Sequence, residues 1–245
     1  MPRFYRAGDA ARALVIVLVS IATCFGQDAS RMEQAVQEKL PGNRFMGTVL
    51  VARGEKILLN KGYGYANLEL EVANTPATKF RIGSITKQFT AMAILLLQAQ
   101  GKLNVQDKLC AYLPNCPEIF KPVTLYHLLT MSSGIPYSTR WDLPGDKMLS
   151  KSATLSAQPG EKWLYADVGF NLLGKVIETV SDQSYEVFMQ KHIFEPLQMS
   201  STGYYHQEKD LAKGYRSSQD DIALQNLDYF AAGALYSTVE DLYRY

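Results

Sequence analysis

The fold is decided by the stretch Phe80-Arg81-Ile82-Gly83-Ser84-Ile85-Thr86-Lys87-Gln88-Phe89-Thr90. It predicts the start of a long helix, with Ser84 and Lys87 three residues apart and therefore on one helix face. A serine hydroxyl is a weak nucleophile until a neighbouring group takes its proton, and an amine one turn away can do this. The positive end of the helix dipole also favours a developing oxyanion. The spacing predicts a nucleophile, Ser84, and its base, Lys87.

The Ser-x-x-Lys pattern is not specific by itself. A chain of 245 residues is expected to contain about one such pattern by chance. The same residues also fit a serine that caps a helix, followed by a solvated lysine. Other segments of the chain have to decide between the two interpretations.

The N-terminus has the pattern of a secretory signal peptide. Three arginines lie in the first twelve residues, and an apolar run follows over residues 13–22. That run is short for a membrane span, and small residues before Gln27 fit a cleavage site. We expect a signal peptide over residues 1–26, a mature chain over 27–245, and export to the periplasm or the extracellular space. An uncleaved membrane anchor is the alternative.

The charge gives no reason to propose a nucleic-acid partner. The formal net charge is +1, and removal of residues 1–26 takes away three basic residues and one acidic residue, which leaves −1. A near-neutral chain without a basic cluster does not have the electrostatic footprint of a nucleic-acid-binding protein. At 47% hydrophobic residues, the chain has ample material for a core.

The cysteines and histidines have no metal-ligand spacing, so we expect no metal and no cofactor. Cys110 and Cys116 bracket a five-residue segment. In an exported protein they can oxidise to a disulfide, and two buried thiols are the alternative. The three histidines are scattered and are interpreted as structural: His127, His192 and His206.

Local patterns predict a mixture of strands and helices. A hairpin is expected from Phe45–Ala52 and Lys56–Tyr65 around Arg53-Gly54. Helices are expected from a capping box at Ser30 to Pro41-Gly42, from about Ser84 to Gly101, near Leu125–Thr130, from Val168 through Val180, from Ser184 to before Pro196, and from a capping box at Ser237. Residues 135–163 are expected to be irregular, and a loop of that length is usually functional.

A second chemical candidate is Tyr165-Ala166-Asp167. A tyrosine near a cationic lysine can lose its proton more readily and can pass protons. A structural tyrosine beside a helix-capping aspartate is the alternative. Tyr65-Ala66-Asn67 fits a Tyr-x-Asn pattern even better, but it closes the predicted hairpin, where a tyrosine at the end of a strand is ordinary.

Together these segments resemble the family of serine β-lactamases and penicillin-binding proteins. The similarity is to the branch that holds class C β-lactamases, D-alanyl-D-alanine carboxypeptidases and related esterases, and it spans about Phe45 to Tyr245. Four segments in family order carry it: Phe80–Lys87, His127–Gly134, Gln158–Gly174 and Ala232–Leu242. Several motifs in one order favour the nucleophile interpretation of Ser84 over the helix cap.

The resemblance implies an α+β, β-lactamase-like fold: an antiparallel sheet flanked by helices plus a mostly helical region, with the sheet incomplete at the C-terminus. It also implies that Ser84 attacks a carbonyl to form an acyl-enzyme, which water later hydrolyses. Lys87 and Tyr165 would share the proton transfers, Asp167 would bind substrate, and the Ser84 amide would form half of the oxyanion hole.

The chain departs from the family pattern at three places. Asp167 stands where many members have asparagine, and an ionised aspartate only accepts hydrogen bonds. Its negative charge would favour the protonated form of Lys87 and weaken Lys87 as a base. Aspartate does occur at this position in esterase-like relatives, so the resemblance implies a shift in substrate preference rather than a loss of activity. Met131 stands where relatives often have histidine. The family's Lys/His-x-Gly motif, which supplies the second oxyanion donor, is absent, so we expect a C-terminally truncated relative.

We therefore expect an exported serine hydrolase that acts through an acyl-enzyme on a β-lactam, a D-Ala-D-Ala peptide or an ester. The expected partner is a small-molecule or peptidoglycan-peptide substrate, with membrane contact only through the signal segment. Two alternatives remain: a non-catalytic relative that binds a peptide or a partner without turnover, and a membrane-tethered envelope protein with an uncleaved N-terminus.

Overall fold

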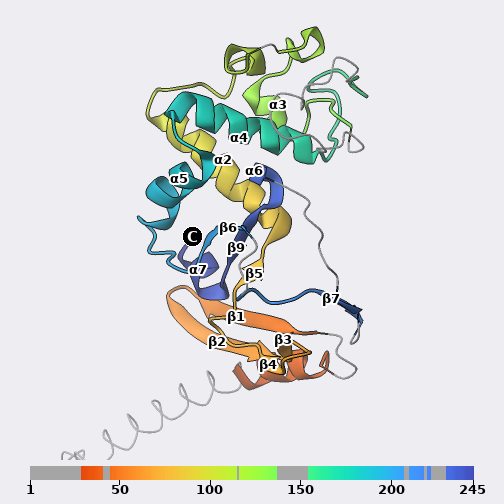
Figure 1. Cartoon of the computed structure of the whole chain (residues 1–245), viewed down its shortest axis with the longest axis vertical. Helices are drawn as coiled ribbons and strands as arrows, with labels where there is room; N and C mark the ends of the chain where they lie inside the picture. Colours follow the sequence, from red (N-terminus) through yellow and green to blue (C-terminus); the bar gives the residue numbers. More distant parts are fainter. Residues whose placement is uncertain are drawn as a thin grey trace, which may run out of the picture. The chain divides into compact units, whose positions relative to one another are not determined.

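The computed structural model describes residues 29–40, 45–114, 116–136, 154–206, 210–217, 220–221 and 230–245. The predicted signal peptide and its cleavage site lie outside these residues. The chain divides into two compact units (Figure 1). The first takes its residues from Met1–Thr78 and Tyr215–Asp221, and the second takes its residues from Lys79–Gly214 and Ile222–Tyr245.

The first unit contains the predicted hairpin. β1 (Gly47–Arg53) pairs antiparallel with β2 (Lys56–Tyr63), and the register puts Gly47 opposite Tyr63. The second strand ends at Tyr63 rather than at Tyr65, because Gly64 takes a positive φ of 60° and turns the chain. Short paired strands complete the unit: β3 (Tyr65–Asn67) with β4 (Val72–Ala73), and β7 (Tyr215–Ser217) with β8 (Asp220–Asp221).

The first helix of the described chain covers residues 29–37. The capping box predicted at Ser30 is wrong, because residue 29 is already helical. The Glu33 carboxylate makes long-range contacts instead: it accepts from Lys61 Nζ at 2.8 Å and from the Tyr63 hydroxyl at 2.9 Å. The predicted stop at residues 41–42 lies outside the described residues.

The second unit has a three-stranded antiparallel sheet in the order β5-β9-β6. β9 (Leu235–Ser237) is the central strand, and it pairs with β5 (Phe80–Arg81) and β6 (Gly203–Tyr204). The Ile82 N–H then donates to Leu235 O at 3.0 Å. The sheet therefore fixes the point at which the chain enters the Ser84 turn.

Two long helices hold the core of the second unit. α2 (Thr86–Ala99) and α4 (Asp167–Ser181) pack against each other, and both contact the short α6 (Phe230–Gly233) (Figure 1). α4 approaches α6 closely at Gly174, where a Cβ atom would lie 2.5 Å from that of Ala231. The fully buried side chains of the two long helices include Phe89, Ile94, Leu97, Leu172, Leu173 and Ile177. Burial of each is worth about 1.5–3 kcal/mol.

The remaining helices are short. Four lie where the sequence predicts a helix: α3 (Leu125–Leu129), α5 (Tyr185–Met189), the π-helical turn η6 (Gln190–Phe194) and α7 (Val239–Arg244). The 3₁₀ turns η3 (Leu109–Ala111) and η4 (Glu118–Phe120) lie where no helix is predicted. The final capping box lies one residue later than predicted. Thr238 caps α7 by accepting from the Asp241 N–H at 3.2 Å. Ser237 is the last residue of β9, and its hydroxyl lies 2.7 Å from that of Thr202.

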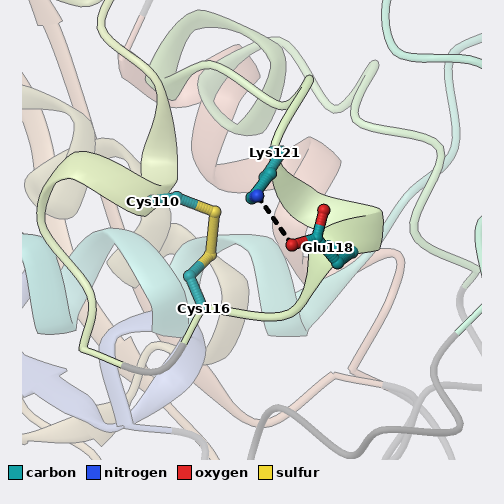
Figure 2. The surroundings of a disulfide bond; sticks show 4 residues. All are labelled: Cys110, Cys116, Glu118 and Lys121. Atoms are coloured by element: carbon teal, nitrogen blue, oxygen red, sulfur yellow. Dashed lines mark ion pairs between the residues drawn. A yellow bond between two sulfur atoms is a disulfide. The ribbon is translucent and has the colours of Figure 1, made fainter.

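Cys110 and Cys116 form a disulfide, which decides between the two alternatives that the sequence leaves open (Figure 2). An ion pair between Lys121 and Glu118, 2.6 Å long, lies beside it. Both cysteines pack against the core of the second unit. A crosslink over so short a loop stabilises the fold by about 2 kcal/mol on the chain-entropy account.

Candidate functional site

Ser84 lies in a tight turn between β5 and α2. The turn is the 3₁₀ segment η2 (Gly83–Ile85), and α2 continues from it at Thr86. Gly83 takes a φ of 51°, a left-handed conformation that side-chain-bearing residues adopt only with strain. The Ser84 side chain is exposed. Backbone N–H groups in a first helical turn have no intrahelical partner, so the Ser84 N–H is suited to bind an anion.

The Lys87 ammonium group contacts three oxygen atoms. Its Nζ lies 3.0 Å from Ser84 Oγ, 2.8 Å from the Ala232 carbonyl oxygen and 2.7 Å from Asp167 Oδ1. A protonated lysine has three N–H donors, so these three oxygens match its full donor capacity. Lys87 is buried, and its positive charge is balanced by the Asp167 carboxylate. The arrangement therefore fixes the position of the Lys87 amino group beside Ser84 Oγ.

Tyr165 contacts the same serine from a different element. Its hydroxyl lies 2.5 Å from Ser84 Oγ, and Lys87 Nζ lies 4.9 Å from the centre of its ring. The backbone beside it is anchored, because the Leu164 N–H donates to Met131 O at 2.8 Å. Ser84 is thus contacted by a phenol and by an ammonium group at the same time.

Met131 supports the site through its backbone rather than through its side chain. It takes a φ of 55°, and its carbonyl holds the segment that carries Tyr165. Histidine is among the residues that enter this left-handed region more readily than most. Methionine has no such preference, so the turn after α3 has to hold Met131 in this conformation.

Several positioning groups could not be found from the sequence. The Ala232 carbonyl binds Lys87, and the Ala232 N–H donates to Asn171 Oδ1 at 2.9 Å. Thr90 Oγ1 donates to Ala231 O at 2.7 Å and lies 2.7 Å from the Tyr185 hydroxyl. Burial raises the pKa of Tyr185, so this hydroxyl stays neutral. These bonds fix α6 against α2 and α4, and with it the Ala232 carbonyl.

The structure brings together all four candidate residues: Ser84, Lys87, Tyr165 and Asp167. The competing Tyr65 lies in β3 of the first unit.

Two of the histidines have structural partners. His127 completes a capping box at the start of α3, where its Nδ1 accepts from the Thr124 N–H at 3.2 Å. Burial, followed by the charge of Lys108, lowers its pKa, so His127 is neutral near pH 7. His206 pairs with Glu186 at 2.8 Å.

The described residues contain neither a metal-binding cluster nor a membrane-spanning helix. No group of three or more His, Cys, Asp or Glu side chains among them could hold a metal ion. None of the helices in this described part is long and apolar enough to cross a membrane.

The sequence is similar to a known protein family along most of its length. The family described as Beta-lactamase matches residues 31–245. The putative penicillin-binding protein PbpX of Bacillus subtilis is 33% identical over 225 residues, which is 86% of this chain and 56% of that protein. Penicillin-binding protein 4* of the same organism is 29% identical over 82% of this chain and 44% of its own length. The chain thus spans about half the length of these curated relatives.

Solved structures give the same result. The octameric penicillin-binding protein homologue from Pyrococcus abyssi matches with a TM-score of 0.73 and 33% identity, over 89% of this chain and 55% of that one. FmtA from Staphylococcus aureus matches with a TM-score of 0.76 and 30% identity, over 88% and 63%. The predicted α+β, β-lactamase-like fold is confirmed. This chain belongs to the Beta-lactamase family.

Proposed function

We propose that the protein is a serine hydrolase that works by acyl transfer, with Ser84 as its nucleophile. One observation carries the proposal: the exposed Ser84 Oγ lies 2.5 Å from the Tyr165 hydroxyl and 3.0 Å from Lys87 Nζ. A structural serine does not need both a proton acceptor and a cation. A nucleophile needs both, because it must lose a proton while negative charge develops beside it.

The contacts divide the labour between Lys87 and Tyr165. Lys87 offers its three donors to three oxygens, and its amino group lies 4.9 Å from the centre of the Tyr165 ring. We assign the proton transfers to Tyr165, which acts as a phenolate. The phenolate takes the Ser84 proton as the Oγ–carbonyl bond forms, and Tyr165 then gives this proton to the leaving group as its bond to the carbonyl carbon breaks. In deacylation, water loses a proton to Tyr165 as its oxygen adds to the acyl carbon. The bond between Ser84 Oγ and that carbon then breaks, and Tyr165 gives the proton to Ser84 Oγ.

The oxyanion that forms during attack needs hydrogen-bond donors. We propose the Ser84 backbone N–H as one of them, at the positive end of α2. The second donor is the role of the Lys/His-x-Gly strand in relatives, and loss of one such donor costs about 10²–10³ in rate.

The proposed substrates carry a reactive carbonyl: an ester, a β-lactam or a D-Ala-D-Ala peptide. The penicillin-binding proteins among the relatives support the last two. Asp167 supports an ester, because it replaces an amide that both donates and accepts with a carboxylate that only accepts. Asp167 Oδ1 already binds Lys87, so we propose the second carboxylate oxygen as the substrate contact.

The test is acylation of the protein by p-nitrophenyl acetate and by a fluorescent penicillin, followed by peptide mapping. We expect a stoichiometric burst, an adduct on Ser84, and continuing release of nitrophenolate as the adduct hydrolyses. Ser84→Ala should abolish the adduct, and Ser156→Ala, which removes an exposed hydroxyl elsewhere in the same unit, should not. An adduct on another serine would overturn the proposal. An adduct that never hydrolyses would mean a binding protein without turnover.

We also propose that residues 1–26 are removed during export. N-terminal sequencing of protein recovered outside the cytoplasm should begin at Gln27. Membrane-bound protein that still begins at Met1 would contradict this and favour an anchor.

A further inference from the structure

An indole is exposed to solvent beside the site. Trp163 keeps 67% of its surface in water, and its ring centre lies 6.3 Å from that of Tyr165. Trp163 lies two residues before Tyr165, in a segment without helix or strand that leads into α4. The indole is thus a neighbour of the ring whose hydroxyl lies 2.5 Å from Ser84 Oγ.

The backbone that carries this indole is firmly held. Three backbone hydrogen bonds tie residues 154–164 to the turn after α3: Ser156 N to Gly134 O at 2.8 Å, Gly160 N to Ser132 O at 2.7 Å, and Leu164 N to Met131 O at 2.8 Å. On its other side the segment continues into α4, with Ala166 buried at the N-cap. A large apolar ring on a fixed backbone is suited to bind a flat apolar group, because little ordering entropy is lost on contact.

The direction of proton transfer indicates which part of a substrate lies near the Trp163 indole. In the proposed mechanism Tyr165 donates its proton to the leaving group, so the leaving atom lies at the Tyr165 hydroxyl. A leaving group that reaches past the Tyr165 ring can contact the exposed Trp163 indole, while the acyl group stays on Ser84. We propose that Trp163 is a specificity-determining residue that selects substrates with a planar, apolar leaving group. This inference rests on the proposed acyl transfer.

The experiment compares two acetate esters whose leaving alcohols have similar acidity: phenyl acetate, with a planar leaving group, and hexafluoroisopropyl acetate, with a non-planar one. Both give the same acetyl group on Ser84, so every later step is identical and the ratio of acylation rates isolates the leaving group. We expect wild-type protein to prefer phenyl acetate, after correction for the uncatalysed rates. Trp163→Ala should reduce this preference roughly threefold to tenfold, as expected for loss of one aromatic contact.

Two variants serve as controls. Trp163→Phe should keep part of the preference, since it retains a planar ring. Leu95→Ala, which shortens another half-exposed apolar side chain of the same unit, should leave the ratio unchanged. Melting curves should show that Trp163→Ala is as stable as wild type, because the indole is mostly exposed. If Ser84 is acetylated but Trp163→Ala keeps the wild-type ratio, the inference is wrong. If neither ester acetylates Ser84, the proposed function itself fails.

Discussion

The two units each contain a lysine, a tyrosine and a carboxylate in contact, yet the two clusters are built for different purposes. In the first unit Lys61 and Tyr63 both donate to the Glu33 carboxylate. In the second unit Lys87 and Tyr165 both contact the Ser84 hydroxyl, and the carboxylate of Asp167 lies on the lysine instead.

The acceptor at the centre decides what each tyrosine can do. Hydrogen bonds, first from Lys61 and then from Gln37 and Tyr63, lower the pKa of Glu33 to about 2. Burial is the main cause that raises the pKa of Tyr63 to about 12, and its hydrogen bond to Glu33 is the second cause. Tyr63 is therefore held as a donor and cannot take a proton near pH 7. Tyr165 faces a hydroxyl, which has a proton to give. The lysines differ too: 53% of the Lys61 side chain is exposed, against 7% for Lys87.

Replacement of the two tyrosines should give the largest difference in acylation rate between the two clusters. Tyr165→Phe should slow acylation of Ser84 by about 10²–10⁴, the usual contribution of a positioned acid–base group. Tyr63→Phe should leave the acylation rate unchanged, because its hydroxyl serves only Glu33. Burst kinetics with p-nitrophenyl acetate measure both. Equal losses in the two variants would remove the distinction between the clusters.

Exchange of the carboxylate beside Lys87 should have a smaller effect. Asp167→Asn keeps an oxygen for Lys87 but removes the negative charge and adds an N–H donor. We expect the ratio of penicillin acylation to ester acylation to rise by roughly tenfold, the value of one hydrogen bond to a charged group. Glu33→Gln, the matched change in the first unit, should not alter this ratio. A fall in the ratio for Asp167→Asn would contradict the role given to its charge.

Acid should weaken the first cluster. The folded-state pKa of Glu33 lies near 2, below its ordinary value of 4.5, so its contribution to stability is present above pH 4.5 and is lost as the pH falls toward 2. Urea unfolding of wild type and Glu33→Gln should therefore differ at pH 6, and the two curves should converge near pH 2. A constant gap across this range would show that the carboxylate is not titrating in the folded protein as described.

The smallest effects concern two glycines. Gly83 and Gly54 both take a positive φ, of 51° and 57°, and a Cβ atom on either would meet no neighbour within 4 Å. Gly83→Ala and Gly54→Ala should each lower stability by about 1 kcal/mol, from backbone conformation alone. Only Gly83→Ala should also slow acylation, since it alone shapes the turn that presents Ser84. A thermal melt and the burst assay separate the two effects.

The sequence predicts the elements that depend on local spacing and misses those that depend on long-range contacts. The hairpin, α2 and α4 follow from turn residues and apolar periodicity, and the candidate residues Ser84 and Tyr165 follow from short motifs just before α2 and α4. The two predicted caps at Ser30 and Ser237 are wrong. Glu33, which would complete the first capping box, binds Lys61 instead. The Ser237 hydroxyl lies beside that of Thr202. Local patterns carry no information about such partners.

One of the three oxygens that contact Lys87 could not be predicted from the sequence, for a different reason. It is a backbone carbonyl, that of Ala232, and every residue has a carbonyl. The left-handed conformation of Met131 is equally hidden, since methionine has no preference for it. Positions of this kind are set by how α6 and the turn after α3 pack, and packing becomes visible only in three dimensions.

The central place of β9 in its sheet has a consequence for the order in which the molecule can be made. A chain is synthesised from its N-terminus, so Ser84 and Lys87 exist long before residues 232 and 235–237. The Cys110–Cys116 loop can close within its own neighbourhood, but the strand beside β5 and the last oxygen for Lys87 arrive about 150 residues after the residues they complete. Ser84 can therefore gain its full set of neighbours only after residue 237 has been synthesised. During the interval before that point the nucleophile exists, but the groups that position it do not.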